Sequence, residues 1–216
     1  PRLKQVCDKY GTLMVADEVM TGFGRTGKWF AMEHWDVVPD IMTLAKGLTG
    51  ASVPLGAVVV SAEVAARIEH EMLQTGLTYC GHPLACAAGL AAIEAYRSEN
   101  LIARSRTLGA SMYTELRALA QRHAVIGEVR GGDGLFAVLE LVRDRATREP
   151  LAPWPQQAPA LRALLADALA QGVSYAARGN LLLLAPPLVI GEQDLADALA
   201  LLDTLLARHF PDPHPG

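Results

Sequence analysis

Two kinds of hydrophobic pattern alternate along the chain. Short apolar runs bounded by polar, glycine or proline residues are typical of strands, and they occur at residues 12–16, 40–45, 54–61, 125–130, 135–141 and 181–185. Apolar positions at helical spacing predict helices over residues 1–10, 30–35, 63–72, 83–99, 101–123, 158–171 and 192–208. Because strands alternate with helices, the order predicts an α/β fold in which helices cover a mostly parallel sheet.

The composition of the chain changes near residue 100. A glycine-rich loop at residues 21–27 lies in the first part, whereas the second part consists of helices, short strands and a proline-rich loop at residues 143–157. We therefore expect two domains, at residues 1–100 and 101–216. The chain begins within a helical pattern that Gly11 ends, so we expect the N-terminal part of the first domain to lie upstream of residue 1.

The composition of the chain argues against some kinds of binding partner. The formal net charge is −4, and no run of lysines and arginines suggests a nucleic-acid partner. No apolar stretch is long and uninterrupted enough to span a bilayer, no signal peptide is present, and the three cysteines do not predict a disulfide framework. These features predict a cytoplasmic protein with no nucleic-acid or membrane partner.

Two polar residues follow apolar runs and are candidates for chemistry. Lys46, one of only four lysines, comes directly after the run 40–45, and Asp17 directly follows the run 12–16. Ligands of open α/β sheets bind at the carboxyl ends of strands, so both side chains are expected at one edge of the sheet. Desolvation lowers the pKa of a lysine, and a neutral amine can form a Schiff base with a carbonyl. Each residue has an ordinary alternative: Lys46 as a strand-end lysine that reaches solvent, and Asp17 as a helix cap or a salt-bridged acid.

Motifs extend this pattern over the whole chain. The stretches are Asp17-Glu18-Val19, Gly22-x-Gly24-Arg25-Thr26-Gly27, Pro39-Asp40-Ile41, Ala45-Lys46-Gly47-Leu48, Thr78-Tyr79-x-Gly81-His82-Pro83-Leu84-Ala85-Cys86 and Ala185-Pro186-Pro187-Leu188. In this order, and with an interval of 29 residues from Asp17 to Lys46, the chain resembles the C-terminal part of the class III aminotransferase family. Members of that family are fold-type I enzymes that depend on pyridoxal 5′-phosphate (PLP). The resemblance implies the end of a PLP-binding large domain over residues 1–100 and a small α/β C-terminal domain over residues 101–216.

The resemblance also implies roles for individual residues. Lys46 would hold PLP as a Schiff base and later shuttle a proton, and Asp17 would pair with the protonated ring nitrogen. Val19 would pack on one face of the ring, although it also fits an ordinary core position. Thr78 would donate a hydrogen bond to the cofactor phosphate of the other subunit, because active sites of the family lie at the interface of a homodimer. Its alternative is an ordinary turn or strand threonine.

Arg178 is the candidate for binding the carboxylate of the substrate, because arginine clamps carboxylates through two parallel hydrogen bonds. Many family members place this arginine nine residues before the alanine-like position of the Pro-Pro motif. That position is Ala176 here, and Arg178 comes two residues later. Arg178 therefore has either a shifted role in substrate binding or a place on the surface. Arg130, in another stretch that resembles the family, is expected to be structural.

A metal site is not predicted. Cys80, His82 and Cys86 offer three ligands, but their spacing does not match that of a zinc knuckle, and no second pair follows. Cys86 fits a small core position in an alanine-rich helix.

The predicted function is that of a PLP-dependent aminotransferase. An amino group would pass from an amine or ω-amino acid donor to a keto acid such as pyruvate or 2-oxoglutarate. The alternatives are a racemase or aminomutase of the same family and a non-catalytic dimerising module. The phosphate-binding loop and the ring-stacking aromatic residue of the family lie upstream of the position that Asp17 occupies. We therefore expect residues 1–216 alone to bind PLP poorly and to turn over little or no substrate.

Overall fold

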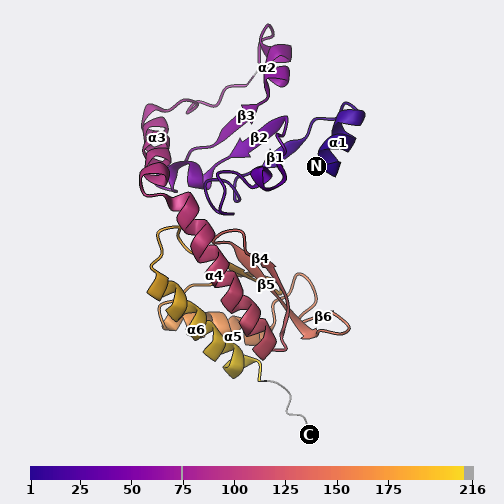
Figure 1. Ribbon diagram of the computed structural model, residues 1–216, viewed down its shortest axis with the longest axis vertical. Helices are drawn as coiled ribbons and strands as arrows, with labels where there is room; N and C mark the ends of the chain where they lie inside the picture. Colours follow the sequence, from indigo (N-terminus) through magenta and orange to yellow (C-terminus); the bar gives the residue numbers. More distant parts are fainter. Residues whose placement is uncertain (74, 212–216) are drawn as a thin grey trace. The chain divides into compact units, whose positions relative to one another are not determined.

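The computed structural model describes residues 1–73 and 75–211 and divides the chain into two compact units, residues 1–104 and 105–216 (Figure 1). Each unit has its own sheet and its own helices. Among the described residues, no helix is long and apolar enough to cross a membrane.

The first unit is built on a three-stranded sheet of order β1-β2-β3. Strands β1 (Val15–Asp17) and β2 (Ile41–Leu44) are parallel, whereas β3 (Ala57–Val60) runs antiparallel to β2. The helices of this unit are α1 (Arg2–Lys9), α2 (Ala62–Ile68) and α3 (Pro83–Ser98), with two 3₁₀ helices, η1 (Ala31–Trp35) and η2 (Lys46–Thr49). All three predicted strands of this unit are present, and each is shorter than its apolar run.

The sheet of the first unit is less buried than its sequence suggests. Apolar runs predicted strands covered on both faces, yet in β1 only Ala16 is buried. The side chains of Val15, Val58 and Val59 are 57%, 65% and 52% exposed. A parallel strand needs a helical layer on each face to be fully buried. The described part of the chain leaves these valines uncovered.

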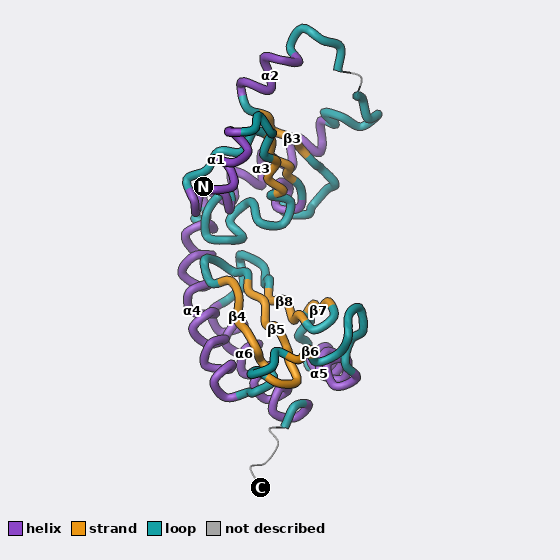
Figure 2. The backbone as a smooth tube through the Cα atoms, turned by 90° about the vertical axis from the view of Figure 1, so that its right-hand side faces the viewer, coloured by secondary structure: helices purple, strands orange, loops and turns teal. Residues whose placement is uncertain are grey.

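The second unit is an antiparallel sheet with three helices. The sheet has the order β4 (Ile126–Gly131), β5 (Ala137–Asp144), β8 (Leu181–Leu184), β7 (Ala176–Arg178), and the two-residue strand β6 (Glu149–Pro150) pairs with β5. The helices are α4 (Leu101–Arg122), α5 (Pro159–Ala170) and α6 (Glu192–His209). The tube view shows the strands gathered together with α4 and α6 alongside (Figure 2). Strand β6 interrupts the predicted loop at residues 143–157, and β7 has no counterpart among the predicted strands.

Alternate side chains of β5 point into the core of the second unit. Ala137, Leu139 and Leu141 are fully buried, as expected when alternate side chains of a strand point to one face. The other fully buried side chains come mainly from the helices and from β8, and include Met112, Leu116, Leu161, Leu164, Leu182, Leu202 and Leu205. Leucine at helical spacing therefore supplies most of the apolar surface that stabilises this unit.

Charged side chains tie the helices of the second unit together at their C-terminal ends. Asp203 of α6 bonds to both Arg122 and His123 at the end of α4, and Asp167 of α5 bonds to both Arg208 and His209 at the end of α6. Each Arg-His pair lies where a helix presents unpaired carbonyls and a partial negative charge. The two clusters connect α4 to α6 and α6 to α5.

Candidate active site

The sheet register places Asp17 and Lys46 at the same edge of the first unit. Asp17 is the last residue of β1 and lies opposite Thr43 of the parallel strand β2, and Lys46 follows Thr43 by three residues. The backbone N–H of Glu18 donates to the carbonyl of Thr43 (3.0 Å), so the two strand ends remain joined beyond the ladder. Both side chains are exposed. Both residues thus lie at or just beyond the carboxyl ends of two adjoining parallel strands, the edge at which α/β sheets bind ligands.

Lys46 has an unusual backbone conformation. Its φ is +47°, in the left-handed region that residues with a side chain rarely adopt, and it opens η2. Such a conformation costs about 1–3 kcal/mol and persists only where the surrounding structure enforces it, often at functional sites. A lysine that simply ended a strand would have no need of it. The backbone therefore favours a specific placement of the Lys46 amine.

Lys46 also lies in the wall of a cavity of about 970 Å³. Most of the wall is apolar, and its polar side chains include those of Thr49, Ser52, Tyr79 and His82. Cavities that are mainly apolar and carry a few polar groups are typical of small-molecule sites. This cavity belongs entirely to the first unit.

The carboxylate of Asp17 has a local partner. Its Oδ1 accepts a hydrogen bond from the backbone N–H of Val19 at 3.0 Å. Asp17 forms no salt bridge with any residue in the described ranges, so the salt-bridged alternative is not what the structure shows. The exposed carboxylate can therefore accept a further proton donor. Val19 itself is half-buried.

Glu18 is a part of this region that sequence reasoning did not single out. It is 2% exposed, and its carboxylate accepts hydrogen bonds from the Thr21 hydroxyl and from the Met32 backbone N–H at 2.9 Å. A buried acid is stable only when it is paired in this way. The side chain links the end of β1 to the glycine-rich loop and to η1. The signal available in the sequence was only an acid next to Asp17.

Thr78 lies in an exposed turn just before α3. Its neighbours Leu77 and Tyr79 line the same cavity as Lys46, but no hydrogen bond from its hydroxyl is seen within the described residues. Cys80 and Cys86 are exposed free thiols, so the core position expected for Cys86 is wrong. Over the part of the chain that the structure describes, no three histidine, cysteine or acidic side chains gather as they would around a metal ion.

Two arginines singled out in the sequence, Arg178 and Arg130, have different surroundings in the second unit. Arg178, the last residue of β7, is exposed and lies over the ring of Trp154, 5.5 Å from its centre. Arg130 donates to Glu128 at 2.8 Å and to Glu140 at 2.5 Å, and the hydrogen bond that Glu140 accepts is the main cause that raises the pKa of Arg130. The carboxylates of its own sheet thus occupy Arg130, in keeping with a structural role.

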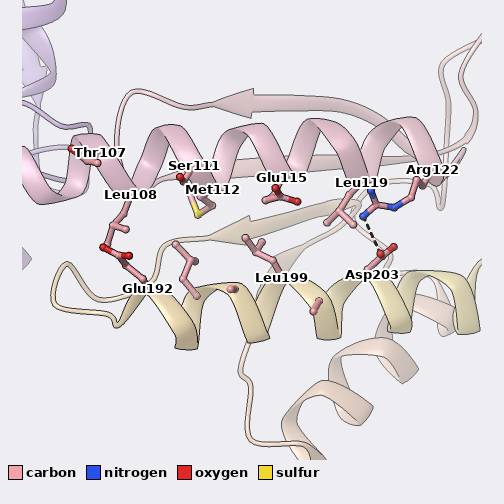
Figure 3. Close-up of a pocket in the computed structure, with 13 residues that line it drawn as sticks. Thr107, Leu108, Ser111, Met112, Glu115, Leu119, Arg122, Glu192, Leu199 and Asp203 are labelled. Carbon is pink, nitrogen blue, oxygen red and sulfur yellow. Dashed lines mark hydrogen bonds and ion pairs between the residues drawn. The ribbon is translucent and has the colours of Figure 1, made fainter.

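A second cavity of about 490 Å³ lies between α4 and α6, which run in the same direction (Figure 3). Apolar side chains such as Leu108, Met112 and Leu199 form its wall, and the ion pair between Arg122 and Asp203 (2.9 Å) closes one end. None of the site residues expected from the sequence lines it. Lys46 lines the first cavity, whereas Asp17, Val19, Thr78 and Arg178 line neither, so the first cavity is the candidate active site through Lys46 alone.

The chain is similar to known aminotransferases over most of its length. The family model "Aminotransferase class-III" matches residues 1–206. Taurine–pyruvate aminotransferase of Bilophila wadsworthia is 37% identical over 93% of this chain, and 5-aminovalerate aminotransferase of Pseudomonas putida is 38% identical over 96% of it. Leucine/methionine racemase of Thermococcus litoralis is 37% identical over 95%. The chain spans 46%, 47% and 44% of these relatives, about half their length.

The same match holds in three dimensions. The crystal structure of taurine:2-oxoglutarate aminotransferase from Bifidobacterium kashiwanohense, solved with PLP and glutamate, is similar to this chain with a TM-score of 0.92 and 40% identity. The similarity covers 97% of this chain and 47% of that one. The mixed α/β fold is thus that of the C-terminal part of PLP-dependent aminotransferases, as the sequence predicted. The chain belongs to the class-III aminotransferase family.

Proposed function

We propose that the complete protein is a PLP-dependent aminotransferase that transfers an amino group from an amine or ω-amino acid to a keto acid such as pyruvate or 2-oxoglutarate. The observation that carries this proposal is the placement of Asp17 and Lys46 at adjoining ends of two parallel strands, with Lys46 in a left-handed turn beside a cavity. The donors and acceptors in the names of the relatives support the substrate class.

The residues present fit PLP as the cofactor. The exposed Lys46 amine would attach the cofactor as a Schiff base, and the exposed Asp17 carboxylate would hold a proton on the ring nitrogen. When bound, PLP withdraws electrons from the substrate carbon that loses a proton. Val19, half-buried next to Asp17, would pack on the ring.

The roles of the protein side chains follow from their chemistry. Lys46, once its amine is released, would move a proton at the substrate carbon as a general base and acid. Asp17 would accept a hydrogen bond from the protonated ring nitrogen and so orient the ring. The apolar part of the cavity wall would exclude water, which strengthens charge interactions inside the site.

Arg178 would bind the carboxylate of the substrate. Its guanidinium is exposed, and among the described residues it forms no salt bridge, in contrast to Arg130. Stacking of Arg178 on Trp154 leaves the edge of the guanidinium available for two parallel hydrogen bonds.

The same proposal includes a homodimer with Thr78 on the cofactor phosphate of the other subunit. Large apolar side chains around Thr78 are strongly exposed: Met72 is 87%, Leu77 77% and Tyr79 79% exposed. Exposed apolar clusters mark interaction surfaces.

We further propose that residues 1–104 end the PLP-binding domain, that residues 105–216 form the small C-terminal domain, and that the protein works in the cytoplasm.

The test is covalent attachment of PLP in the complete protein. We expect the wild type to keep, after dialysis, an absorbance band at the short-wavelength edge of the visible range. After borohydride reduction, peptide mass spectrometry should find the cofactor on Lys46. Lys46→Ala should lack both signals. Lys9→Ala, which removes an exposed lysine of α1, should keep both. A folded wild type without the band would refute the enzyme proposal in favour of a non-catalytic dimerising module.

The racemase relative supports a second candidate function, inversion of an amino acid at its α-carbon. An aminotransferase moves nitrogen between two substrates, whereas a racemase or aminomutase does not. Nitrogen-15 supplied in the amine donor should therefore appear in alanine or glutamate formed from the keto acid. Inversion of a single amino acid with no transfer of label would favour the racemase.

A further inference from the structure

The turn that carries Lys46 is held from outside by a buried tyrosine. The carbonyls of Ala45 and Lys46 accept hydrogen bonds from the backbone N–H groups of Leu48 (3.0 Å) and Ala51 (3.1 Å). The next carbonyl, that of Gly47, accepts two, one from the Gly50 N–H at 3.1 Å and one from the Tyr96 hydroxyl at 2.7 Å. Tyr96 thus fixes the peptide between Gly47 and Leu48, one residue beyond Lys46, from a position 49 residues after Gly47.

The hydroxyl of Tyr96 is well suited to donate. Tyr96 lies near the end of α3 and is 8% exposed. Burial raises the pKa of its phenol, an effect that the nearby positive charge of Arg25 partly offsets. The phenol therefore stays protonated at neutral pH and can donate to a carbonyl.

The ring of Tyr96 has little freedom to move. Phe23 stacks on it with a centroid distance of 6.0 Å and an interplanar angle of 26°, and Trp29 meets it edge-on at 6.0 Å. Phe23 also packs against Gly47, where an added Cβ would lie 2.7 Å from the Cβ of Phe23. Tyr96, Phe23 and Gly47 therefore form a closed set of contacts around the peptide between Gly47 and Leu48.

Helix α3 is brought close to η2 by a small residue on the same face as Tyr96. Gly89 precedes Tyr96 by two helical turns, and a Cβ there would lie 3.5 Å from the carbonyl oxygen of Leu48 and 3.3 Å from Leu55 Cδ2. Ala85, Gly89 and Tyr96 are the buried residues of α3. The helix therefore docks on η2 through this face, which sets the distance that the Tyr96 hydroxyl has to span.

We propose that Tyr96 is a positioning residue for Lys46: its hydroxyl holds the Gly47 carbonyl and so maintains the left-handed turn that directs the Lys46 amine. The inference rests on the proposed attachment of PLP to Lys46. Tyr96 needs no contact with substrate or cofactor for this role. A left-handed lysine is costly, and this contact supplies part of the surrounding structure that keeps it in place.

The test is Tyr96→Phe in the complete, PLP-loaded protein, because this change removes one oxygen and leaves the ring contacts. We expect borohydride to fix the cofactor on Lys46 as before, which separates this test from that of the proposed function. The visible absorbance of the Lys46-bound cofactor changes with pH, and we expect the midpoint of this change to lie at a different pH in the variant. The kcat should fall about tenfold, near the upper limit for one neutral hydrogen bond, with little change in the KM of the donor.

Tyr175→Phe is the matched control. The Tyr175 hydroxyl also donates to a backbone carbonyl, that of Ala198 at 2.5 Å, and burial raises the pKa of Tyr175 to about 12, but the bond lies in the second unit. We expect this variant to lose stability without a change in the cofactor spectrum. An unchanged spectrum and kcat in Tyr96→Phe would overturn the positioning role. So would a Tyr96→Phe protein that fails to fold while Tyr175→Phe folds, because the hydroxyl would then serve stability alone.

Discussion

At the scale of single residues, substitution of Arg178 tests whether its guanidinium binds the carboxylate of the substrate. We expect Arg178→Gln to lower kcat/KM for a keto acid about tenfold to a hundredfold, because a charge-assisted hydrogen bond contributes about 1.5–3 kcal/mol. Steady-state kinetics of the complete protein with varied pyruvate measures this change. Arg130→Gln is the control, since Glu128 and Glu140 already pair with Arg130. Equal effects of the two substitutions would remove Arg178 from the site.

Residues differ in how well the sequence reveals them. Asp17 and Lys46 were recognised because each ends an apolar run within a motif, and the register brings them to one sheet edge. Glu18 and Tyr96 were not, because their partners are backbone groups at distant positions: the Met32 N–H and the Gly47 carbonyl. No local pattern marks a side chain whose partner is a peptide group 14 or 49 residues away. The left-handed backbone of Lys46 was equally invisible, since a lysine carries no signal for a positive φ.

At the scale of elements, the contact between α4 and α6 has a defined dependence on pH. Hydrogen bonding to His123, and also to Arg122, holds the pKa of the Asp203 carboxyl below its usual range. A lowered pKa in the folded state adds stability above the unfolded pKa of about 4, and this stability is lost as the pH falls through the folded value. Because the Asp203 side chain is 37% exposed, solvent screening limits the contribution to about 1 kcal/mol.

We therefore expect Asp203→Asn to lower the free energy of unfolding by about 1 kcal/mol at pH 7 and by much less at pH 3. Urea unfolding of the complete protein at both pH values measures the difference. Asp197→Asn removes the same charge from the same helix, where the carboxylate accepts a hydrogen bond from the exposed Gln193, and should have little effect at either pH. A penalty for Asp203→Asn that stays constant down to pH 3 would show that the carboxylate charge is not the cause.

The bounds of the long helices were predicted more accurately from the sequence than the strands were. Helices α3, α4, α5 and α6 match their predicted ranges to within two residues, because their apolar positions repeat over three turns or more. Strand β7 was missed because Ala176-Ala177-Arg178 contains neither a β-branched nor an aromatic residue. The antiparallel direction of β3 could not be derived, since an apolar run shows burial and not direction. The pairing of β6 with β5 depends on tertiary contacts within a proline-rich loop.

At the scale of the whole molecule, the proposed dimer makes each active site depend on two chains. Lys46→Ala and Thr78→Val should each be nearly inactive, yet mixing them should restore activity. In a hybrid dimer, one of the two sites would be intact. Its Lys46 would come from the Thr78→Val chain, and its Thr78 would come from the Lys46→Ala chain. Random reassortment of equal amounts gives about one quarter of the wild-type activity, measured by transaminase assay after dissociation and reassembly.

The control mixes Lys46→Ala with Asp17→Asn. These residues would serve the same subunit's site, because they lie on adjoining strands of one chain, so no hybrid has an intact site. Recovery in both mixtures would contradict the shared site, and recovery in neither would place Thr78 in its own subunit's site.

The contact between Arg178 and Trp154 provides an optical probe. Of the three tryptophans, Trp154 alone belongs to the second unit, whereas Trp29 and Trp35 belong to the first. Indole fluorescence depends on charge near the ring, and the Trp154 face carries a guanidinium while 66% of the residue is exposed. A carboxylate that draws Arg178 away from the indole would alter its emission. The part of the emission change that disappears in Trp154→Phe would report substrate arrival without a dye or a coupled enzyme.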